Sequence, residues 1–379
     1  MLTATQVTVS RSALLATLGR VALVVARNKL SIPIIGAVHI APEANGLRFT
    51  ATDFDRTVSS VAACDDPRED FEACAVPCLR LLAVVTQLPA GTVTITQTAK
   101  GIRVAAGSTR FDLVGMPVGE FPFGEPLATA SPLIAVGAPA LLASLSRLAS
   151  HVSSEPSRPA LNGMCVESQP DGGLEIVATD GYRMARETLS APSAKGLKVL
   201  LPSNAVATLI KLFDGASEVG VQLDGQRAAF CAIDGDDIRF VTRTIDAAFP
   251  DVHHFFKVVL PERAIVDRIA LLAAVRRMAS LSTSDSLLIR LEWSRGSVRV
   301  CAIGDTDAGD AEDVVPCDFN GPSDRSIHFS PRYLVDALVV RQADTVWIDL
   351  KNGDSHMALR DAGSLVVQSL VMPRRDPRK

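Results

Sequence analysis

The alternation of apolar and polar positions predicts the same kinds of element several times along the chain. Apolar residues recur at helical spacing in six segments, namely 11–28, 77–88, 140–152, 202–213, 268–280 and 331–341. Between them lie alternating runs bounded by Gly or Pro, which predict strands, for example 46–54, 91–98 and 101–107. Helices separated by groups of such strands indicate an α+β fold, with helices on one side of antiparallel sheets.

The chain also contains an internal repeat. Shifting the sequence by 127 positions places residues 13–56 on residues 140–183, and 15 of the 44 ungapped positions are identical. Composition alone would give about four. A fainter third copy begins near residue 268, where LLAAVRRMA (271–279) aligns with LLASLSRLA (141–149). The period is too long for a solenoid unit, so each copy predicts a domain. The expected domains are residues 1–128, 129–253 and 254–379.

Composition narrows the class of protein. With 47% hydrophobic and 21% charged residues, the chain of 379 residues has a globular composition and is not disordered overall. No stretch of eighteen or more uncharged apolar residues predicts a transmembrane helix. The seven cysteines are an odd number without CxxC pairs, which is typical of reduced thiols in the cytoplasm.

Positive charge is concentrated on the predicted helices although the formal net charge of the chain is −4. The six segments hold one acidic residue, Asp336, and eleven basic ones, a pattern that favours a polyanion contacted through its phosphates without base reading. Helical geometry places Arg20 opposite its apolar stripe, and Arg147 and Arg277 are its equivalents. We therefore expect all three to face away from the sheets and to contact this polyanion. The basic residues are Arg11, Arg20, Arg27, Arg80, Arg147, Lys211, Arg268, Arg276, Arg277, Arg332 and Arg341.

Motifs of catalytic and cofactor chemistry are absent from the sequence. It contains no GxxxxGK[ST], GxGxxG, HExxH or GxSxG, and its histidines and cysteines lack metal-ligand spacing. We therefore expect no catalytic residue, no cofactor and no metal. A hydrolase that uses one of the cysteines is the enzymatic alternative.

Several segments together resemble the bacterial DNA polymerase III beta subunit, or sliding clamp, family. They are EPSRPALNGM (155–164), LEIVATDGYRMA (174–185), FPD (249–251), a helix with Tyr333 and a terminal VMP (371–373). The resemblance covers the whole chain in order. It implies three DNA-clamp domains per chain and a head-to-tail homodimeric ring, with helices lining a central hole and sheets outside. It also implies a non-catalytic processivity factor that encircles duplex DNA and binds polymerase subunits and a clamp loader through short linear motifs.

The resemblance also implies roles for individual residues. DNA contact falls on Lys29 and Arg158, and the subunit interface on Phe111 and Leu281. One partner-peptide pocket lies between the second and third domains. Its matching residues are Leu161, Thr179, Gly181, Tyr182, Arg183, Met184, Pro250, Tyr333, Leu370, Met372 and Pro373.

Two segments depart from the family pattern. Arg374 stands where relatives have an apolar pocket residue, and a basic tail follows it. The segment DVHHFF (251–256) replaces a stretch that usually contains Tyr and Arg. An alternative interpretation is therefore a divergent clamp paralogue that acts as an interaction scaffold, or as an inhibitor-tolerant clamp, with altered partner specificity.

Overall fold

A computed structural model gives the structure of the chain as two compact units. The first comprises Met1–Leu142 and Asn204–Thr244, and the second comprises Ala143–Ser203 and Ile245–Lys379. Each unit is considered by itself. The structure describes residues 5–26, 32–64, 70–123, 133–191, 195–235, 237–281, 287–303, 311–323 and 325–375.

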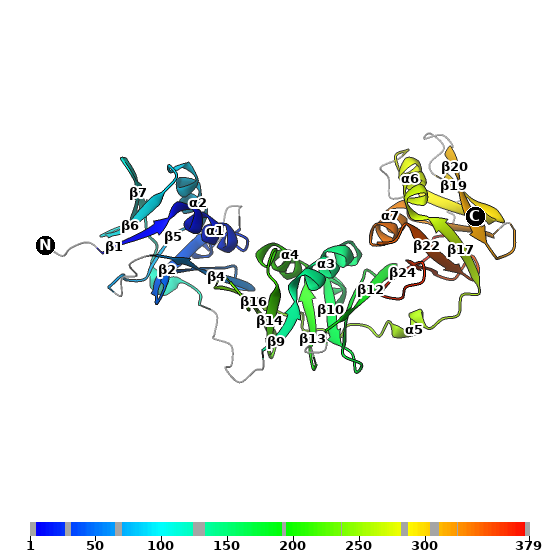
Figure 1. Cartoon of the computed structure of the whole chain (residues 1–379), viewed down its shortest axis with the longest axis horizontal. Helices are drawn as coiled ribbons and strands as arrows, with labels where there is room; N and C mark the ends of the chain where they lie inside the picture. The colour runs from blue at the N-terminus through cyan, green and yellow to red at the C-terminus, as the bar shows by residue number, and fades with distance from the viewer. Residues whose placement is uncertain are drawn as a thin grey trace. The chain divides into compact units, whose positions relative to one another are not determined.

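The same order of elements occurs three times along the chain (Figure 1). Each repeat consists of one strand, a helix, four strands, a second helix and three strands. The first repeat consists of β1 (Gln6–Ser10), α1 (Arg11–Val21), β2 (Ala37–Glu43), β3 (Gly46–Thr52), β4 (Arg56–Ala63), β5 (Cys74–Pro77), α2 (Cys78–Gln87), β6 (Thr92–Thr98), β7 (Gly101–Ala106) and β8 (Thr109–Val114). The second consists of β9 (Ile134–Gly137), α3 (Ala138–Leu148), β10 (Gly163–Ser168), β11 (Gly173–Thr179), β12 (Arg183–Ser190), β13 (Lys198–Pro202), α4 (Ser203–Leu212), β14 (Glu218–Asp224), β15 (Arg227–Ala232) and β16 (Ile238–Arg243).

The third repeat follows a short helix, α5 (His253–Phe256), that the sequence did not predict. It consists of β17 (Glu262–Asp267), α6 (Arg268–Ala279), β18 (Leu288–Ser294), β19 (Gly296–Ile303), β20 (Ala311–Phe319), β21 (Arg325–Phe329), α7 (Pro331–Val339), β22 (Thr345–Leu350), β23 (Met357–Asp361) and β24 (Val367–Val371). The six predicted helices and the α+β class are confirmed.

Helix α1 is shorter than predicted. It begins where the Ser10 hydroxyl accepts a hydrogen bond from the amide of Ala13, a standard N-cap. It ends at Val21 rather than near residue 28, because the next amides bond three residues back: Leu23 to Arg20 and Val25 to Ala22. Such bonds tighten and terminate the last turn of a helix.

The first unit holds two antiparallel sheets. One has the strand order β1-β6-β7-β8, and the other has the order β5-β2-β3-β4-β16-β15-β14-β9. In the second sheet the first repeat is joined to strands of the second repeat by β4 and β16, from Arg56 opposite Thr242 to Ser60 opposite Ile238. The junction between these repeats is therefore a continuous backbone ladder.

The second unit holds one twelve-stranded sheet, in the order β13-β10-β11-β12-β24-β23-β22-β17-β20-β19-β18-β21. Here the second repeat joins the third through β12 and β24, from Arg183 opposite Val371 to Glu187 opposite Val367. The residues on β12 are those that the shift of 127 places on the β4 junction. The two junctions therefore use the same strand of the repeat.

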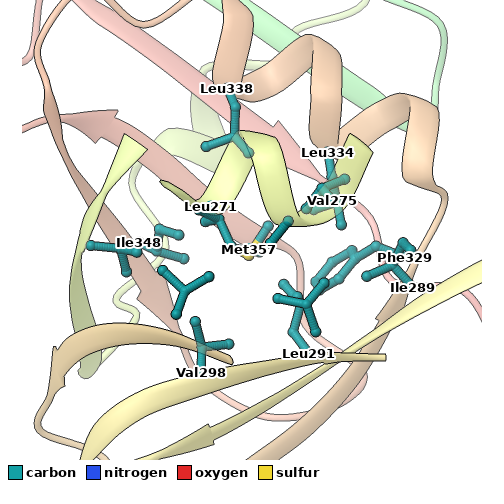
Figure 2. Close-up of a cluster of buried hydrophobic side chains, with 14 of the residues drawn as sticks. Leu271, Val275, Ile289, Leu291, Val298, Phe329, Leu334, Leu338, Ile348 and Met357 are labelled. Atoms are coloured by element: carbon teal, nitrogen blue, oxygen red, sulfur yellow. The ribbon is translucent and has the colours of Figure 1, made fainter. Parts of the chain in front are cut away.

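The third repeat has the core shown in Figure 2. Helices α6 and α7 contact each other, and α6 lies over β19 and β20 (Figure 1). Their inward side chains meet apolar residues of the sheet in one cluster, in which Trp293 is fully buried. The labelled members are Leu271, Val275, Ile289, Leu291, Val298, Phe329, Leu334, Leu338, Ile348 and Met357 (Figure 2).

Two further features bear on function. Within the described parts of the chain, no helix is long and apolar enough to cross a membrane. The same residues contain no group of three or more His, Cys, Asp or Glu side chains placed to hold a metal ion.

Candidate functional site

The ATDGYR segment forms a tight turn between β11 and β12. The Asp180 carboxylate accepts hydrogen bonds from the amides of Tyr182 (2.9 Å) and Arg183 (3.0 Å). The Thr179 hydroxyl donates to the Arg183 carbonyl and accepts from the Gly181 amide. Gly181 has a φ of 90°, in the left-handed region that glycine adopts without strain. The turn therefore depends on the Thr-Asp-Gly order.

Arg183 lies beneath this turn, with its side chain 1% exposed. Its guanidinium donates to Asp180 at 3.0 Å, to Asp336 on α7 and to the carbonyl of Ser150. It also stacks 4.6 Å from the centre of the Tyr333 ring. Each of the three guanidinium nitrogens is thus hydrogen-bonded within the protein, and the pocket role that the resemblance implies for Arg183 stays a prediction. Its role here is to hold the β11–β12 turn against helix α7 of the third repeat.

The first repeat contains an equivalent arginine, Arg56, that holds its turn in the same way. The guanidinium of Arg56 binds Asp53 three residues earlier and reaches helix α4, where it donates to the Thr208 hydroxyl (3.0 Å) and the Asn204 carbonyl (3.3 Å). Phe54, with φ 77°, occupies the left-handed position that Gly181 has in the second repeat. Each arginine thus ties its turn to the second helix of the following repeat.

Two aromatic rings, a methionine and the exposed backbone of the turn form the surface above Arg183, here called the tyrosine site. The rings of Tyr182 and Tyr333 stack 6.3 Å apart, and the Met372 amide donates to the Tyr182 carbonyl. Tyr182 is 48% exposed and Met372 38% exposed. Partial burial raises the pKa of Tyr333, and Asp180 adds to the rise. The tyrosine site therefore offers an apolar surface with hydroxyl rims.

The other predicted pocket residues surround the tyrosine site to different degrees. Leu161 approaches Gly181, since a Cβ added there would lie 4.0 Å from its side chain, and Met184 pairs with buried Leu370 across β12 and β24. Pro250 is exposed and Pro373 half-buried.

A neighbouring cavity of about 280 Å³ shares Leu370 with this region. Helix α5, from the DVHHFF segment, contributes Phe255 and Phe256 to its lining. Arg186 lies 4.0 Å over the Phe256 ring, which holds α5 against the sheet. The segment that departs from the family pattern therefore forms one wall of a cavity of mixed polar and apolar lining beside the tyrosine site.

The three equivalent helix arginines bind groups on the sheets, so the expectation that they face away from the sheets was wrong, while their contact with DNA stays a prediction. Arg20 contacts Ser60 on β4, Arg147 binds the buried carboxylate of Glu187 on β12, and Arg277 binds Asp313 on β20. A long side chain on the flank of a helix can curl back to a polar group on the sheet, which the angular argument ignored.

Other basic residues counted on the helices also serve the fold. Arg11 donates to the carbonyls of Val85 and Thr86 at the end of α2, and Arg268 donates to that of Ala343. Arg341 lies beyond α7 and is 3% exposed, and burial lowers its pKa to about 10. Arg27 lies outside the described residues. Among those that the structure describes, the exposed helix cations are Arg80, Lys211, Arg276, Arg277 and Arg332.

The remaining predicted residues fall in several places. Lys29 lies outside the described residues. Arg158 is half exposed, and a Cβ added to Gly181 would lie 3.1 Å from its guanidinium. Phe111 is 37% exposed on the edge strand β8, and Leu281 is half-buried against the core of the third repeat.

The cysteine chemistry of the enzymatic alternative finds little support. All seven cysteines are free thiols. Burial raises the pKa of Cys74 and Cys78 to about 12 and that of Cys165 and Cys317 to about 11. Thiols with such pKa values are protonated at neutral pH and react poorly as nucleophiles.

Sequence reasoning missed the acceptors that hold Arg183. Asp336 is the one acidic residue on the predicted helices. A single acid among eleven basic residues was the available signal that it binds a particular cation, which the structure shows to be Arg183. The carbonyl of Ser150 gave no signal, because any residue supplies the same group. Asp180 was visible through its recurrence as Asp53 in the first repeat.

Three family models match the chain in succession. Residues 5–125 match the N-terminal domain of the DNA polymerase III beta subunit, residues 139–251 its central domain and residues 259–375 its C-terminal domain. Together they extend over most of the chain.

Individual proteins similar to this chain belong to the same family. The chain is 31% identical over 345 residues to a beta sliding clamp of Caulobacter vibrioides, covering 87% of this chain and 89% of the relative. It is 30% identical over 376 residues to that of Pseudomonas aeruginosa, covering 97% and 99%. A crystal structure of the C. crescentus beta sliding clamp, with polyethylene glycol bound at a region described as beta-motif tethering, matches with a TM-score of 0.90 and 28% identity. That match covers 99% of this chain and all of the other.

The occupied donors of Arg183 predict a large cost for its removal. Arg183→Ala should lower the free energy of unfolding by about 3–5 kcal/mol, because Asp180 and Asp336 lose a buried partner. The matched control is Arg332→Ala, whose side chain is 76% exposed and 4.0 Å from the same Asp336, and which should cost about 1 kcal/mol or less. Urea unfolding followed by circular dichroism measures both, and equal costs would contradict the positioning role.

Proposed function

The chain belongs to the DNA polymerase III beta subunit family of sliding clamps, and on that basis we propose that two copies close head to tail into a ring around duplex DNA. Members of this family are non-catalytic processivity factors. The ring would hold replicative and repair polymerases on DNA without fixing their position. We further propose that it acts in the cytoplasm, that a clamp loader places it on DNA, and that its domains meet near residues 128 and 253.

The observation that carries the ring proposal is a junction left open in the single chain. The first repeat offers β4 to a strand of the second, and the second offers β12 to a strand of the third. The counterpart of these strands in the third repeat is β20. Strand β17 pairs with its last three residues, so in the described chain residues 311–316 have a ladder partner on the β19 side alone.

A matching strand is exposed at the other end of the repeat series. Strand β8 is the counterpart of β16 in element order, and it is the edge of its four-stranded sheet. Strand β8 exposes the side chains of Phe111 and Val114, and Val114 is 67% exposed. Strand β20 exposes the side chain of Val314. An unprotected apolar edge favours pairing with another chain. Pairing β8 of one copy with β20 of a second, twice, closes a symmetric dimer.

The partner-peptide pocket is proposed at the tyrosine site. Stacked tyrosines beside a methionine suit an apolar peptide end, and the backbone of the Gly181 turn is accessible to peptide groups. Arg374 and helix α5 favour the divergent form of this function, with partners different from those of other clamps.

DNA contact is proposed for Arg20, Lys29, Arg147, Arg158 and Arg277, joined by the exposed helix residues Arg80, Lys211 and Arg276. Positive charge on helices attracts phosphates at any sequence, as a sliding contact requires. Because Arg147 and Arg277 are paired with carboxylates, their share of this attraction is smaller than a count of charges suggests.

Charge reversal on the exposed helix residues tests DNA contact. The triple variant Arg80→Glu, Lys211→Glu and Arg276→Glu should fold normally but be lost from nicked circular DNA at moderate salt after loading, because three phosphate attractions become repulsions. A charge-matched control reverses Lys100, Lys195 and Lys351, which lie outside helices and strands. Wild type should remain on circular DNA and leave when it is linearised. Retention of the triple variant equal to wild type, or loss of wild type from intact circles, would overturn this part of the proposal.

A charge on the β8 edge tests ring closure. Phe111→Asp should convert the dimer to monomers in light scattering at micromolar concentration, since an interfacial carboxylate would lose its water without gaining a partner. Leu281→Asp is a poorer test, because Leu281 packs against the core of the third repeat. Val259→Asp is the control, at a side chain that is 79% exposed in the segment between α5 and β17. A monomeric wild type would refute closure.

The tail residue Arg374 tests the peptide pocket. A short uncharged peptide with a Gln and a Leu-Phe end should bind wild type weakly. Arg374→Met should strengthen it by about 1 kcal/mol, the scale of burying one or two methylene groups. Arg375→Met, which changes the next exposed arginine, serves as the control and should leave affinity unchanged. Calorimetric titration measures the affinity of the peptide for wild type and for each variant. Equal affinities would place Arg374 outside the pocket, and failure of every form to bind would remove the pocket from the tyrosine site.

A further inference from the structure

The first unit contains a cavity of about 770 Å³ that the proposed function does not use. It lies at the β4–β16 junction, and its rim includes Phe54, Phe123, Arg239 and Arg243. This cavity, here called the arginine cavity, falls in the volume range of ordinary ligand pockets.

The arginine cavity occupies the place in the first junction that the tyrosine site occupies in the second. A shift of 127 places Phe54 on Gly181 and Asp55 on Tyr182. The strand pairing at the two junctions has the same register. Thr57 lies opposite Val241 in the first junction, and its equivalent Met184 lies opposite Leu370 in the second. The repeated fold therefore places corresponding surfaces at both junctions, and the side chains determine what each can bind.

The lining of the arginine cavity is polar and basic. Four hydroxyl side chains, Thr50, Thr52, Thr57 and Ser59, come from β3 and β4, and register places Thr50 opposite Ser59 and Thr52 opposite Thr57. Arg227, Arg239 and Arg243 come from β15 and β16, and Asp55 is the acidic residue of the lining. Arg227 is paired with Asp224 at 2.9 Å, so the cavity's positive charge rests on Arg239 and Arg243. Arg243 and Asp55 lie 3.8 Å apart and both are about 70% exposed, so water screens that pair. The excess positive charge favours an acidic ligand.

Phe54 supplies a second and independent observation. Among the described non-glycine residues it is the one with positive φ, 77°, and its ring is 49% exposed. A left-handed conformation is strained for a side chain with a Cβ, and the second repeat forms the same turn with glycine. Strain of this kind is retained where the side chain has a use beyond the fold. Here it presents an aromatic ring at the rim of a basic cavity.

We propose that the arginine cavity is a second docking site, which binds a short acidic peptide segment of a partner protein. Arg239 and Arg243 would pair with carboxylates. The hydroxyls of Thr50 and Ser59 would bond the peptide backbone, since Thr52 is buried and bonded to Thr57. Phe54, Phe123 and Val241 would cover an apolar side chain of the segment. This inference goes beyond the proposed function, and it holds whether or not the tyrosine site takes the expected peptide.

The test uses the full chain and a fluorescein-labelled hexapeptide of alternating Glu and Leu, followed by fluorescence anisotropy. The double variant Arg239→Glu and Arg243→Glu should weaken binding about tenfold or more, since both side chains are exposed and charge pairing is reversed. The control Lys100→Glu and Lys351→Glu changes the net charge equally and should bind as wild type. A Lys-Leu hexapeptide should not bind.

Phe54→Gly separates a binding role from a structural one. Glycine relieves the left-handed strain, so the melting temperature should stay level or rise while peptide affinity falls. Unchanged affinity in both the double variant and Phe54→Gly would overturn the proposal. So would displacement of the hexapeptide by inorganic phosphate or duplex DNA alone, which would identify a general anion site. Loss of binding in Tyr182→Ala would assign the hexapeptide to the tyrosine site and also refute it.

Discussion

An arginine at each junction between repeats, half-buried in the first (Arg56) and buried in the second (Arg183), fixes the geometry on which the rest of the structure depends. Arg56 and Arg183 each bind an aspartate within their own turn and then reach the second helix of the next repeat. The backbone ladder next to each arginine joins two repeats in one sheet. An unpaired guanidinium would be costly at such a buried position, so the turn, the helix and the ladder must form together.

This constraint also shapes the exposed surface at each junction, namely the tyrosine site and the arginine cavity. A turn that must hold Arg183 below it leaves its own backbone and Tyr182 on the surface, beside the ring of Tyr333. The same turn in the first repeat presents Phe54 and Asp55 instead. One architecture thus produces an apolar site at one junction and a basic site at the other. The third repeat lacks the Ala-Thr-Asp triplet, and we propose that its junction is completed by a second copy.

Much of the fold was predictable from sequence because it depends on local pattern. The spacing of apolar residues located six helices, and the identities between residues 13–56 and 140–183 revealed the repeat. Side-chain direction was less predictable: angular position on a helix did not show that Arg147 would curl back to buried Glu187. Helix α5 was missed, because four residues are too few for periodicity. The tyrosine site came from resemblance, while the arginine cavity needed the structure, since its lining comes from separate strands.

Amide hydrogen exchange at several protein concentrations tests most directly the claim that a second copy completes the open junction. The account predicts that amides of β8 and of residues 311–316 in β20 become protected together as concentration rises. Amides of β21, an edge strand outside the proposed interface, should exchange at one rate throughout. Exchange in β8 and β20 that is independent of concentration while the protein dimerises, or protection that appears in β21 instead, would contradict the account.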